Sequence, residues 1–214
     1  MLKAREVGHR VVCAISIHPF SDESRLFHFP NSWVTKLQAE AMGIRLIEAS
    51  TLDLKDESES QALTGAFQKA KDLYAIEGLV HGGIASEFQK RIFGDACSTV
   101  RLELISPLWH SEPREYMNQL MKNRFEILIT SVSAMGLDEK WLGRPLDYGA
   151  IEELANLSSK YGFNLTFEGG EAETVVTDCP LFGKRLAIAK SRKVWDGQRG
   201  IFEILEASLV GKDV

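Results

Sequence analysis

The sequence lacks the features of secreted and membrane-spanning proteins. Only three of its 214 residues are cysteines, Cys13, Cys97 and Cys179, and they lie far apart. An odd number at such spacing predicts neither a disulfide framework nor a zinc site, and is typical of a reducing cytoplasm. No apolar run reaches the roughly eighteen residues of a membrane span, and no charged leader precedes an apolar stretch. We therefore expect a cytoplasmic chain with no membrane contact.

Positive charge is also in deficit. The 25 Lys and Arg residues face 30 Asp and Glu residues, which gives a net charge of −5 at pH 7. A protein of this sign repels the phosphate backbone of nucleic acids, so we expect no nucleic-acid partner. The 44% apolar and 26% charged content is ordinary for a globular protein, and the length suits one large domain or two small ones.

The first half of the chain alternates strand and helix patterns. Strands are predicted at residues 10–17, 45–49, 79–80 and 102–105, and helices at residues 33–42, 57–76 and 86–98. Such alternation predicts an α/β fold with a parallel, doubly wound sheet. Residues 2–7 resemble the last turns of a helix closed by Gly8, and they lead directly into the first strand. A strand should precede that helix in a β-α-β unit, and none is present in the sequence.

The pattern changes after Pro107. We place a boundary near residues 106–110, which gives a first domain of residues 1–107 and a second of residues 108–214. The second half contains predicted helices at 113–122 and 149–161 and predicted strands at 125–132, 174–177, 185–190 and 201–205. This order predicts a smaller mixed α/β domain.

The densest polar segment is the run of residues 167–174, Phe-Glu-Gly-Gly-Glu-Ala-Glu-Thr. Three carboxylates are costly to place in a core because like charges repel and lose hydration. A Gly-Gly turn can instead present backbone N–H groups to a ligand, while the carboxylates hold a cation, an amine or ammonia. A solvated acidic hairpin turn explains the segment equally well.

A second candidate is the run of residues 80–86, Val-His-Gly-Gly-Ile-Ala-Ser, between a predicted strand and a helix. Ligands of open α/β sheets bind at this edge, where helix N-termini attract phosphates. The segment lacks the spacing of a dinucleotide fingerprint or a Walker loop, and a tight turn alone would also explain it. Lone histidines such as His28 and His110 are more often structural than catalytic. No cysteine and histidine cluster has metal-ligand spacing, so we predict no protein-bound metal.

In their order along the chain, these segments resemble the diphthine–ammonia ligase family, which belongs to the adenine-nucleotide alpha-hydrolase-like ATP pyrophosphatases. The motifs that carry the resemblance are Phe27-His28-x-Pro30-Asn31, Leu37-Gln38-Ala39-Glu40-Ala41-x-Gly43-Ile44, Glu77-Gly78-x-Val80-x-Gly82-x-Ile84-Ala85-Ser86-x-Phe88-Gln89, Ser106-Pro107-Leu108-Trp109, Val132-Ser133-Ala134-x-Gly136-Leu137-Asp138-x-x-Trp141-Leu142-Gly143-Arg144, Glu168-Gly169-Gly170-Glu171-x-Glu173-Thr174 and Asp178-x-Pro180-Leu181-Phe182. They span nearly the whole chain, and several in order are more specific than any one alone.

The resemblance implies a Rossmann-like nucleotide domain and a specific reaction. ATP adenylates the carboxylate of diphthine, a modified histidine on elongation factor 2, and ammonia displaces AMP to give diphthamide and pyrophosphate. Adenylation turns a poor leaving oxygen into a good one, so the protein mainly positions the reactants and stabilises developing charge. The implied cofactors are ATP and magnesium, and the implied partners are elongation factor 2 and ammonia. A homo-oligomer is compatible with this reading.

The resemblance also assigns roles to residues. The nucleotide would be bound by the first domain through residues at two of the motifs: His28, Asn31, Gly82, Gly83, Ser86 and Gln89. The substrate would be bound in the second domain by Gly169, Gly170, Glu173 and Thr174. Glu168 and Glu171 would be the catalytic pair, orienting ammonia or the trimethylamino group of diphthine.

The sequence departs from the family pattern in two places. Family members open with a strand followed by Ser-Gly-Gly-Lys-Asp-Ser, the PP-loop that binds pyrophosphate, and this segment is missing, as is the strand expected above. We expect a late start of a working ligase. The alternatives are an amide ligase with another acceptor, or a non-catalytic binding module. The second departure is Ile92, which stands where the family usually has arginine; Arg91 precedes it.

Overall fold

The structure is a computed structural model that describes residues 1–20, 31–53 and 56–212. Its chain divides into two compact units, each a mixture of helices and strands. Unit 1 consists of Met1–Ser32 and Ile44–His110, and unit 2 consists of Trp33–Gly43 and Ser111–Val214. The sequence analysis grouped residues 33–43 with the first domain, whereas the structure packs them in unit 2.

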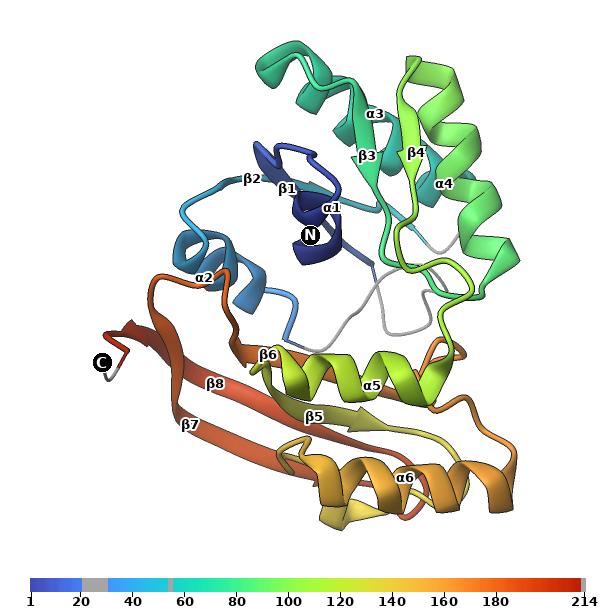
Figure 1. The fold of residues 1–214 in the computed structure, drawn as a ribbon, viewed down its shortest axis with the longest axis vertical. Coiled ribbons are helices and arrows are strands. Elements are labelled where there is room, and N and C mark those ends of the chain that lie inside the picture. The colour runs from blue at the N-terminus through green and yellow to red at the C-terminus, as the bar shows by residue number, and fades with distance from the viewer. Residues whose placement is uncertain (21–30, 54–55, 213–214) are drawn as a thin grey trace. The chain divides into compact units, whose positions relative to one another are not determined.

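Unit 1 contains two parallel strand pairs (Figure 1). Its elements are α1 (Leu2–Glu6), β1 (Cys13–His18), β2 (Arg45–Ser50), α3 (Asp56–Tyr74), β3 (Gly78–Val80), α4 (Glu87–Val100) and β4 (Glu103–Ile105). Strand β1 pairs with β2 from Cys13 opposite Arg45 onward, and β3 pairs with β4 from Gly78 opposite Glu103 onward. The parallel strands predicted from the alternation are confirmed. In the described residues they form two separate two-stranded sheets.

One hydrophobic core serves both strand pairs of unit 1. Helix α3 contributes Leu63 and Phe67, and these pack with Ile17 of β1 and Ile47 of β2. Cys97 of α4 lies in the same cluster, together with half-buried side chains from β3 and β4. Burial of these apolar side chains is the main stabilising contribution to the unit, at roughly 25 cal/mol per Å² removed from water.

Unit 2 is built on an antiparallel four-stranded sheet with the strand order β6-β5-β8-β7 (Figure 1). Its elements are α2 (Val34–Ala41), α5 (Pro113–Lys122), β5 (Glu126–Val132), the 3-10 helix η1 (Glu139–Trp141), α6 (Tyr148–Tyr161), β6 (Ala172–Asp178), β7 (Arg185–Trp195) and β8 (Gly200–Val210). Strands β7 and β8 are longer than predicted. The added residues 191–194 of β7 are all exposed, and Arg192 among them forms an ion pair with Glu203 of β8, so this end of the strand lacks the apolar alternation of a half-buried strand.

Helices cover both faces of this sheet. Helices α5 and α6 pack on one face, where Ile151 joins Ile127 and Ile129 of β5 in the largest core cluster. Helix α2 packs in a separate cluster, in which Val34 joins Val175 of β6. Val175 pairs with Leu128, the β5 residue between Ile127 and Ile129, so it points to the opposite face. Both faces are therefore buried by helices.

Several helix ends follow the local signals in the sequence. Ser86 caps α4 by accepting a hydrogen bond from the Gln89 N–H at 3.3 Å, Pro113 is the first residue of α5, and Gly162 ends α6 with φ of 80°. Helix α2 begins without such a cap. The N-cap residue is Trp33, which makes no side-chain cap bond, and the Ser32 hydroxyl contacts His18 instead. No helix in the described part of the chain combines the length and apolarity that crossing a bilayer requires.

Candidate functional site

The acidic loop of unit 2, residues 163–171, connects α6 to β6. Phe163 and Leu165 anchor its start in the core. The Asn164 side-chain oxygen then accepts hydrogen bonds from the N–H and hydroxyl of Thr166, both at 2.9 Å. Phe167 follows with φ of 63°, a left-handed backbone conformation that costs free energy for a residue with a side chain. This strained turn places Glu168, which is half-buried, at the head of the Gly-Gly pair.

The Glu171 carboxylate closes the loop on itself. One oxygen accepts a hydrogen bond from the Asn164 N–H at 2.9 Å, and the other accepts one from the Gly169 N–H at 2.8 Å. A Cβ atom on Gly169 would lie 2.6 Å from the same carboxylate, so a side chain there would force it aside. Charge-assisted bonds to backbone amides are strong. Glu171, predicted as a catalytic residue, thus has a structural task within the loop.

Strand β5 fixes the other end of the loop. The N–H groups of Ser133 and Ala134 both donate to the Glu171 carbonyl, at 2.8 and 3.2 Å. The Ser133 hydroxyl donates to the Gly170 carbonyl at 2.7 Å. Ser133 was noted in the sequence only as part of a motif. Its hydrogen bonds connect two motifs that are 37 residues apart in sequence.

Glu168 has an electrostatic neighbour that the sequence analysis missed. Burial raises the pKa of Tyr116 on α5, and the negative charge of Glu168 raises that pKa further. Tyr116 packs against the main core of unit 2, as does Phe167 beside Glu168. An aromatic residue near the carboxylate cannot be found from sequence spacing, because α5 precedes the loop by about fifty residues.

Glu173 and Thr174, predicted in the substrate-binding loop, lie within strand β6 instead. Glu173 pairs with Ser131 of β5 and is half-buried, whereas Thr174 pairs with Ile129 and is exposed. The Gly-Gly pair marks a turn, but the residues after it already have the alternating burial of a strand. Strand β6 therefore begins at Ala172, two residues before the predicted start at residue 174.

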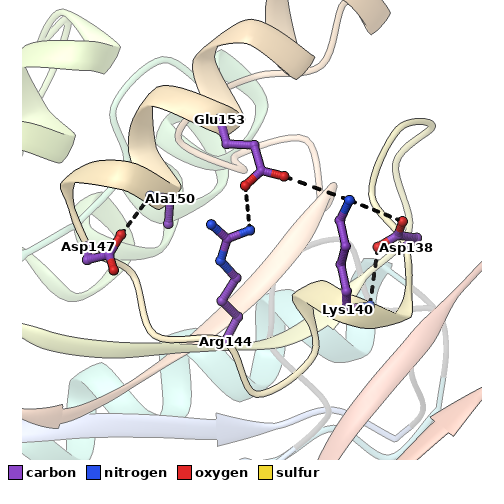
Figure 2. Close-up of polar contacts among 6 residues, drawn as sticks. All are labelled: Asp138, Lys140, Arg144, Asp147, Ala150 and Glu153. Atoms are coloured by element: carbon purple, nitrogen blue, oxygen red, sulfur yellow. Dashed lines mark hydrogen bonds and ion pairs between the residues drawn. The ribbon is translucent and has the colours of Figure 1, made fainter.

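The segment between β5 and α6 carries another family motif, and the structure gives it a packing role. Trp141 is fully buried, and the Arg144 guanidinium lies 4.1 Å from the centre of its ring. Arg144 also forms an ion pair with Glu153 of α6 at 2.7 Å, and Lys140 approaches the same carboxylate at 3.8 Å (Figure 2). Asp147 is the N-cap residue of α6, and its side chain accepts a hydrogen bond from the Ala150 N–H.

In unit 1, four of the residues predicted to bind nucleotide, Gly82, Gly83, Ser86 and Gln89, follow the carboxyl end of β3. Gly82 is exposed with open space where a Cβ atom would be, while Gly83 is buried. A Cβ on Gly83 would lie 2.2 Å from the His81 ring, which is itself buried against Phe93 with 4.4 Å between ring centres. Gly83 is thus required by packing, and Gly82 leaves room for a ligand.

The remaining predicted nucleotide residues are distributed along the same edge and beyond it. The Ser86 oxygen accepts the hydrogen bond that caps α4, and Gln89 is in the first turn of that helix. Asn31 is buried with φ of 61°. His28 lies outside the described residues.

The structure also assembles a polar group that the sequence analysis did not identify. His18 ends β1, and its two ring nitrogens lie 3.1 Å from the Ser32 hydroxyl and 3.0 Å from a Glu48 carboxylate oxygen. The histidine before Pro19, at a strand's carboxyl end, was the available signal. In the described residues, no three His, Cys, Asp or Glu side chains lie so that they could hold a metal ion.

Comparison with known proteins finds a matching family domain for each half of the chain. Residues 2–104 match the family model of the diphthamide synthase N-terminal domain, and residues 112–210 match that of the C-terminal domain. The diphthine–ammonia ligase of Rattus norvegicus is 30% identical over 213 residues, covering 91% of this chain and 79% of that protein. Those of Bos taurus and Homo sapiens are 29% identical over 212 residues with the same coverage. The resemblance seen in the motifs is confirmed: the chain belongs to the diphthamide synthase family, whose curated relatives are ATP-dependent ligases named diphthine–ammonia ligase.

Proposed function

We propose that this chain catalyses the ATP-dependent amidation of diphthine on elongation factor 2 to diphthamide. The observation that carries the proposal is the acidic loop, in which Glu171 and Ser133 hold the backbone around Glu168, whose negative charge raises the pKa of Tyr116 on α5. A carboxylate held this way suits a substrate that carries a fixed positive charge. The relatives' name supplies the reaction, and their sequences match both units of this chain.

The reaction balances in two steps. A carboxylate oxygen of diphthine attacks the α-phosphorus of ATP, the P–O bond to pyrophosphate breaks, and an acyl adenylate forms. The ammonia nitrogen then attacks the acyl carbon, the C–O bond to AMP breaks, and the nitrogen loses a proton as the amide forms. The chain's contribution is to hold the reactants in line and to exclude water from the acyl adenylate.

The two glutamates have different roles in this proposal. Glu168 contacts the cationic trimethylamino group or the incoming ammonia, because Glu171 already uses both carboxylate oxygens on the backbone. Glu171 is then a positioning residue that acts through the shape of the loop. Gly170 adopts φ of 78°, which brings the chain back toward β6 without a side-chain clash. Thr174 and Glu173 would contact the substrate from the start of β6.

Unit 1 supplies the nucleotide site in this proposal. Gly82 permits close approach of a ligand, and Ser86 and Gln89 begin a helix whose positive end favours phosphate. Asn31 and His28 complete the assignment by resemblance. Magnesium would be bound mainly by the nucleotide phosphates, as this cation usually keeps most of its other ligands as water.

We also propose that the two strand pairs of unit 1 belong to one doubly wound sheet. They share a single core, to which α3 and α4 both contribute side chains. An experimental structure of the chain tests this. Backbone hydrogen bonds that join the two pairs into one sheet support it, and two pairs that remain separate contradict it.

The activity is tested with the purified chain. Incubation with diphthine-containing elongation factor 2, magnesium-ATP and ammonium should yield AMP, pyrophosphate and diphthamide. Glu168→Gln should lower kcat by at least about a hundredfold, as expected for loss of a charged group at the reacting centre. Glu171→Gln should lower activity and also speed exchange at Asn164 or Gly169, because the amide nitrogen that replaces one carboxylate oxygen cannot accept the hydrogen bond that this oxygen receives.

Glu139→Gln is the matched control, since Glu139 is an exposed glutamate of the same unit on η1. It should retain wild-type kcat. Amidation at the wild-type rate by Glu168→Gln would contradict the role of Glu168. Failure of the wild-type chain to form AMP from ATP, together with no thermal stabilisation by magnesium-ATP, would contradict the proposed function as a whole.

A further inference from the structure

The Lys90 ammonium is held at the carboxyl ends of β3 and β4 by an aromatic ring. Its Nζ atom lies 3.9 Å from the centre of the Trp109 ring. Lys90 belongs to the beginning of α4, and Trp109 belongs to the turn that follows β4. Because both segments start at the ends of paired parallel strands, the contact lies at the edge of the sheet where α/β proteins bind ligands.

The position of Trp109 is fixed by its own neighbours. The Trp109 ring stacks on that of His110 with 5.0 Å between ring centres. The backbone N–H of Trp109 donates a hydrogen bond to the Ser106 carbonyl at 3.1 Å. The His110 N–H donates to the Ile84 carbonyl at 2.7 Å, which ties this turn to the loop that carries Gly82 and Gly83. The aromatic support of Lys90 is therefore a built feature of two connected turns.

The charge on Lys90 is not neutralised within the described residues. Within the described residues, the Lys90 side chain contacts the Trp109 ring and makes neither a hydrogen bond nor an ion pair. A cation near a helix N-terminus is electrostatically unfavourable, because the peptide dipoles already make that end positive. Two sources of positive potential at one place favour an anion between them.

The neighbouring residues on α4 are directed elsewhere. Ile92 packs into the core of unit 1. Arg91 is exposed and lies over the Phe88 ring of its own helix at 5.9 Å. A separate polar group is present at the same turn: the Ser106 hydroxyl is buried and makes no hydrogen bond in the described residues. Buried hydroxyls of this kind are uncommon in proteins unless a ligand or water serves them.

We propose that Lys90 binds a phosphate of the nucleotide, with Trp109 as its support, and this inference rests on the proposed ATP-dependent function. The ammonium supplies a point charge for a phosphate oxygen, and the ring holds the side chain in place so that less entropy is lost on binding. Lys90 was not among the nucleotide-binding residues that the sequence indicated.

Calorimetric titration of the full natural chain with magnesium-ATP and, separately, with adenosine tests this role. Lys90→Met should weaken ATP binding by about tenfold to a hundredfold, the range of one hydrogen bond to a charged group. Adenosine affinity should stay within about twofold, because adenosine has no phosphate. Lys90→Arg should retain most of the ATP affinity, since it keeps both the charge and the ring contact.

Arg91→Met is the control, because it removes a basic side chain from the next position of the same helix. It should leave both affinities unchanged. Unchanged ATP affinity in Lys90→Met, with wild type binding ATP normally, would overturn the role of Lys90 and leave the proposed function intact. An equal loss for ATP and adenosine would also overturn it, since that is the result of a purely structural contact. No ATP binding by wild type would instead refute the proposed function, and the inference with it.

Discussion

At the scale of single residues, the adjacent glycines Gly82 and Gly83 of unit 1 differ in the space available for a side chain. Gly83 faces the buried His81 ring, and a Cβ atom there would approach it to 2.2 Å, whereas Gly82 has no atom within 4 Å of that position. Gly83→Ala should therefore destabilise the fold by roughly 1–3 kcal/mol, the usual cost of overpacking a core. Urea unfolding of both alanine variants checks this.

Gly82→Ala serves as the matched control and should unfold at nearly the wild-type urea concentration. Its effect should instead be on ATP affinity, if a ligand approaches the backbone there as proposed. Equal stability of the two variants would mean that the His81 ring moves away from Phe93 at little cost, and the packing explanation for Gly83 would be wrong.

At the scale of elements, the segment between β5 and α6 depends on one carboxylate. Glu153 joins Arg144 and Lys140 to α6 (Figure 2). Residues 143–146 pair with β5 through the Gly143 and Leu146 N–H groups. Glu153→Gln should speed hydrogen exchange at both amides and cost about 1 kcal/mol or less, because the pair is partly exposed. Exchange measured by NMR at low and at high salt checks this, since salt should shrink the difference.

The neighbouring Glu152 provides the control for that experiment. It is also on α6 but pairs with Arg114 of α5. Glu152→Gln should leave exchange at Gly143 and Leu146 unchanged. The same acceleration in both variants would show that any lost charge on α6 loosens the segment, and the specific role of Glu153 would be refuted.

At the scale of the whole molecule, the burial of three thiols and one tyrosine hydroxyl should lower the stability of the fold at alkaline pH. Burial raises the pKa of the Cys97 thiol from 9.0 to about 11 and also raises that of Cys13; Cys179 and Tyr116 are raised mainly by burial too. The unfolded chain releases these protons first, so it binds fewer protons than the native state above pH 9. The free energy of unfolding should therefore be unaffected by these groups below pH 9 and fall as the pH rises from 9 through 11.

Urea titrations at several pH values between 8 and about 11 measure this slope. Cys97→Ala should give a shallower slope over that interval, whatever its effect on stability at neutral pH, because one shifted group is gone. An unchanged slope would mean that the Cys97 thiol ionises equally in the native and unfolded chains, in conflict with its burial.

Local chemistry explains which parts of the fold were predictable. Ser86 marks the start of α4 and Gly162 marks the end of α6. Both act through residues only a few positions away, so these helix ends can be predicted from the sequence. The start of α2 and the exposed end of β7 were not predictable. Trp33 is the N-cap residue of α2 and makes no side-chain cap bond, and residues 191–194 of β7 are all exposed, with Arg192 paired to Glu203 across the hairpin.

The candidate site shows the same division. The sequence identified the acidic loop, and the motif order identified the family, which the comparisons confirm. It could not separate the roles of Glu168 and Glu171, because both are glutamates beside a Gly-Gly pair. Only the folded loop shows that Glu171 bonds the Asn164 and Gly169 N–H groups.

By itself, then, the sequence determined the order and type of most helices and strands, the parallel pairing of strands in the first half, and the family. These follow from periodicity, caps and motifs, which act over a few residues or are read directly. The tertiary structure alone decided that residues 33–43 pack with the second half, that Ser133 holds the acidic loop, and that Trp109 supports Lys90. Such contacts join distant segments, and their energies depend on distances that no local pattern encodes.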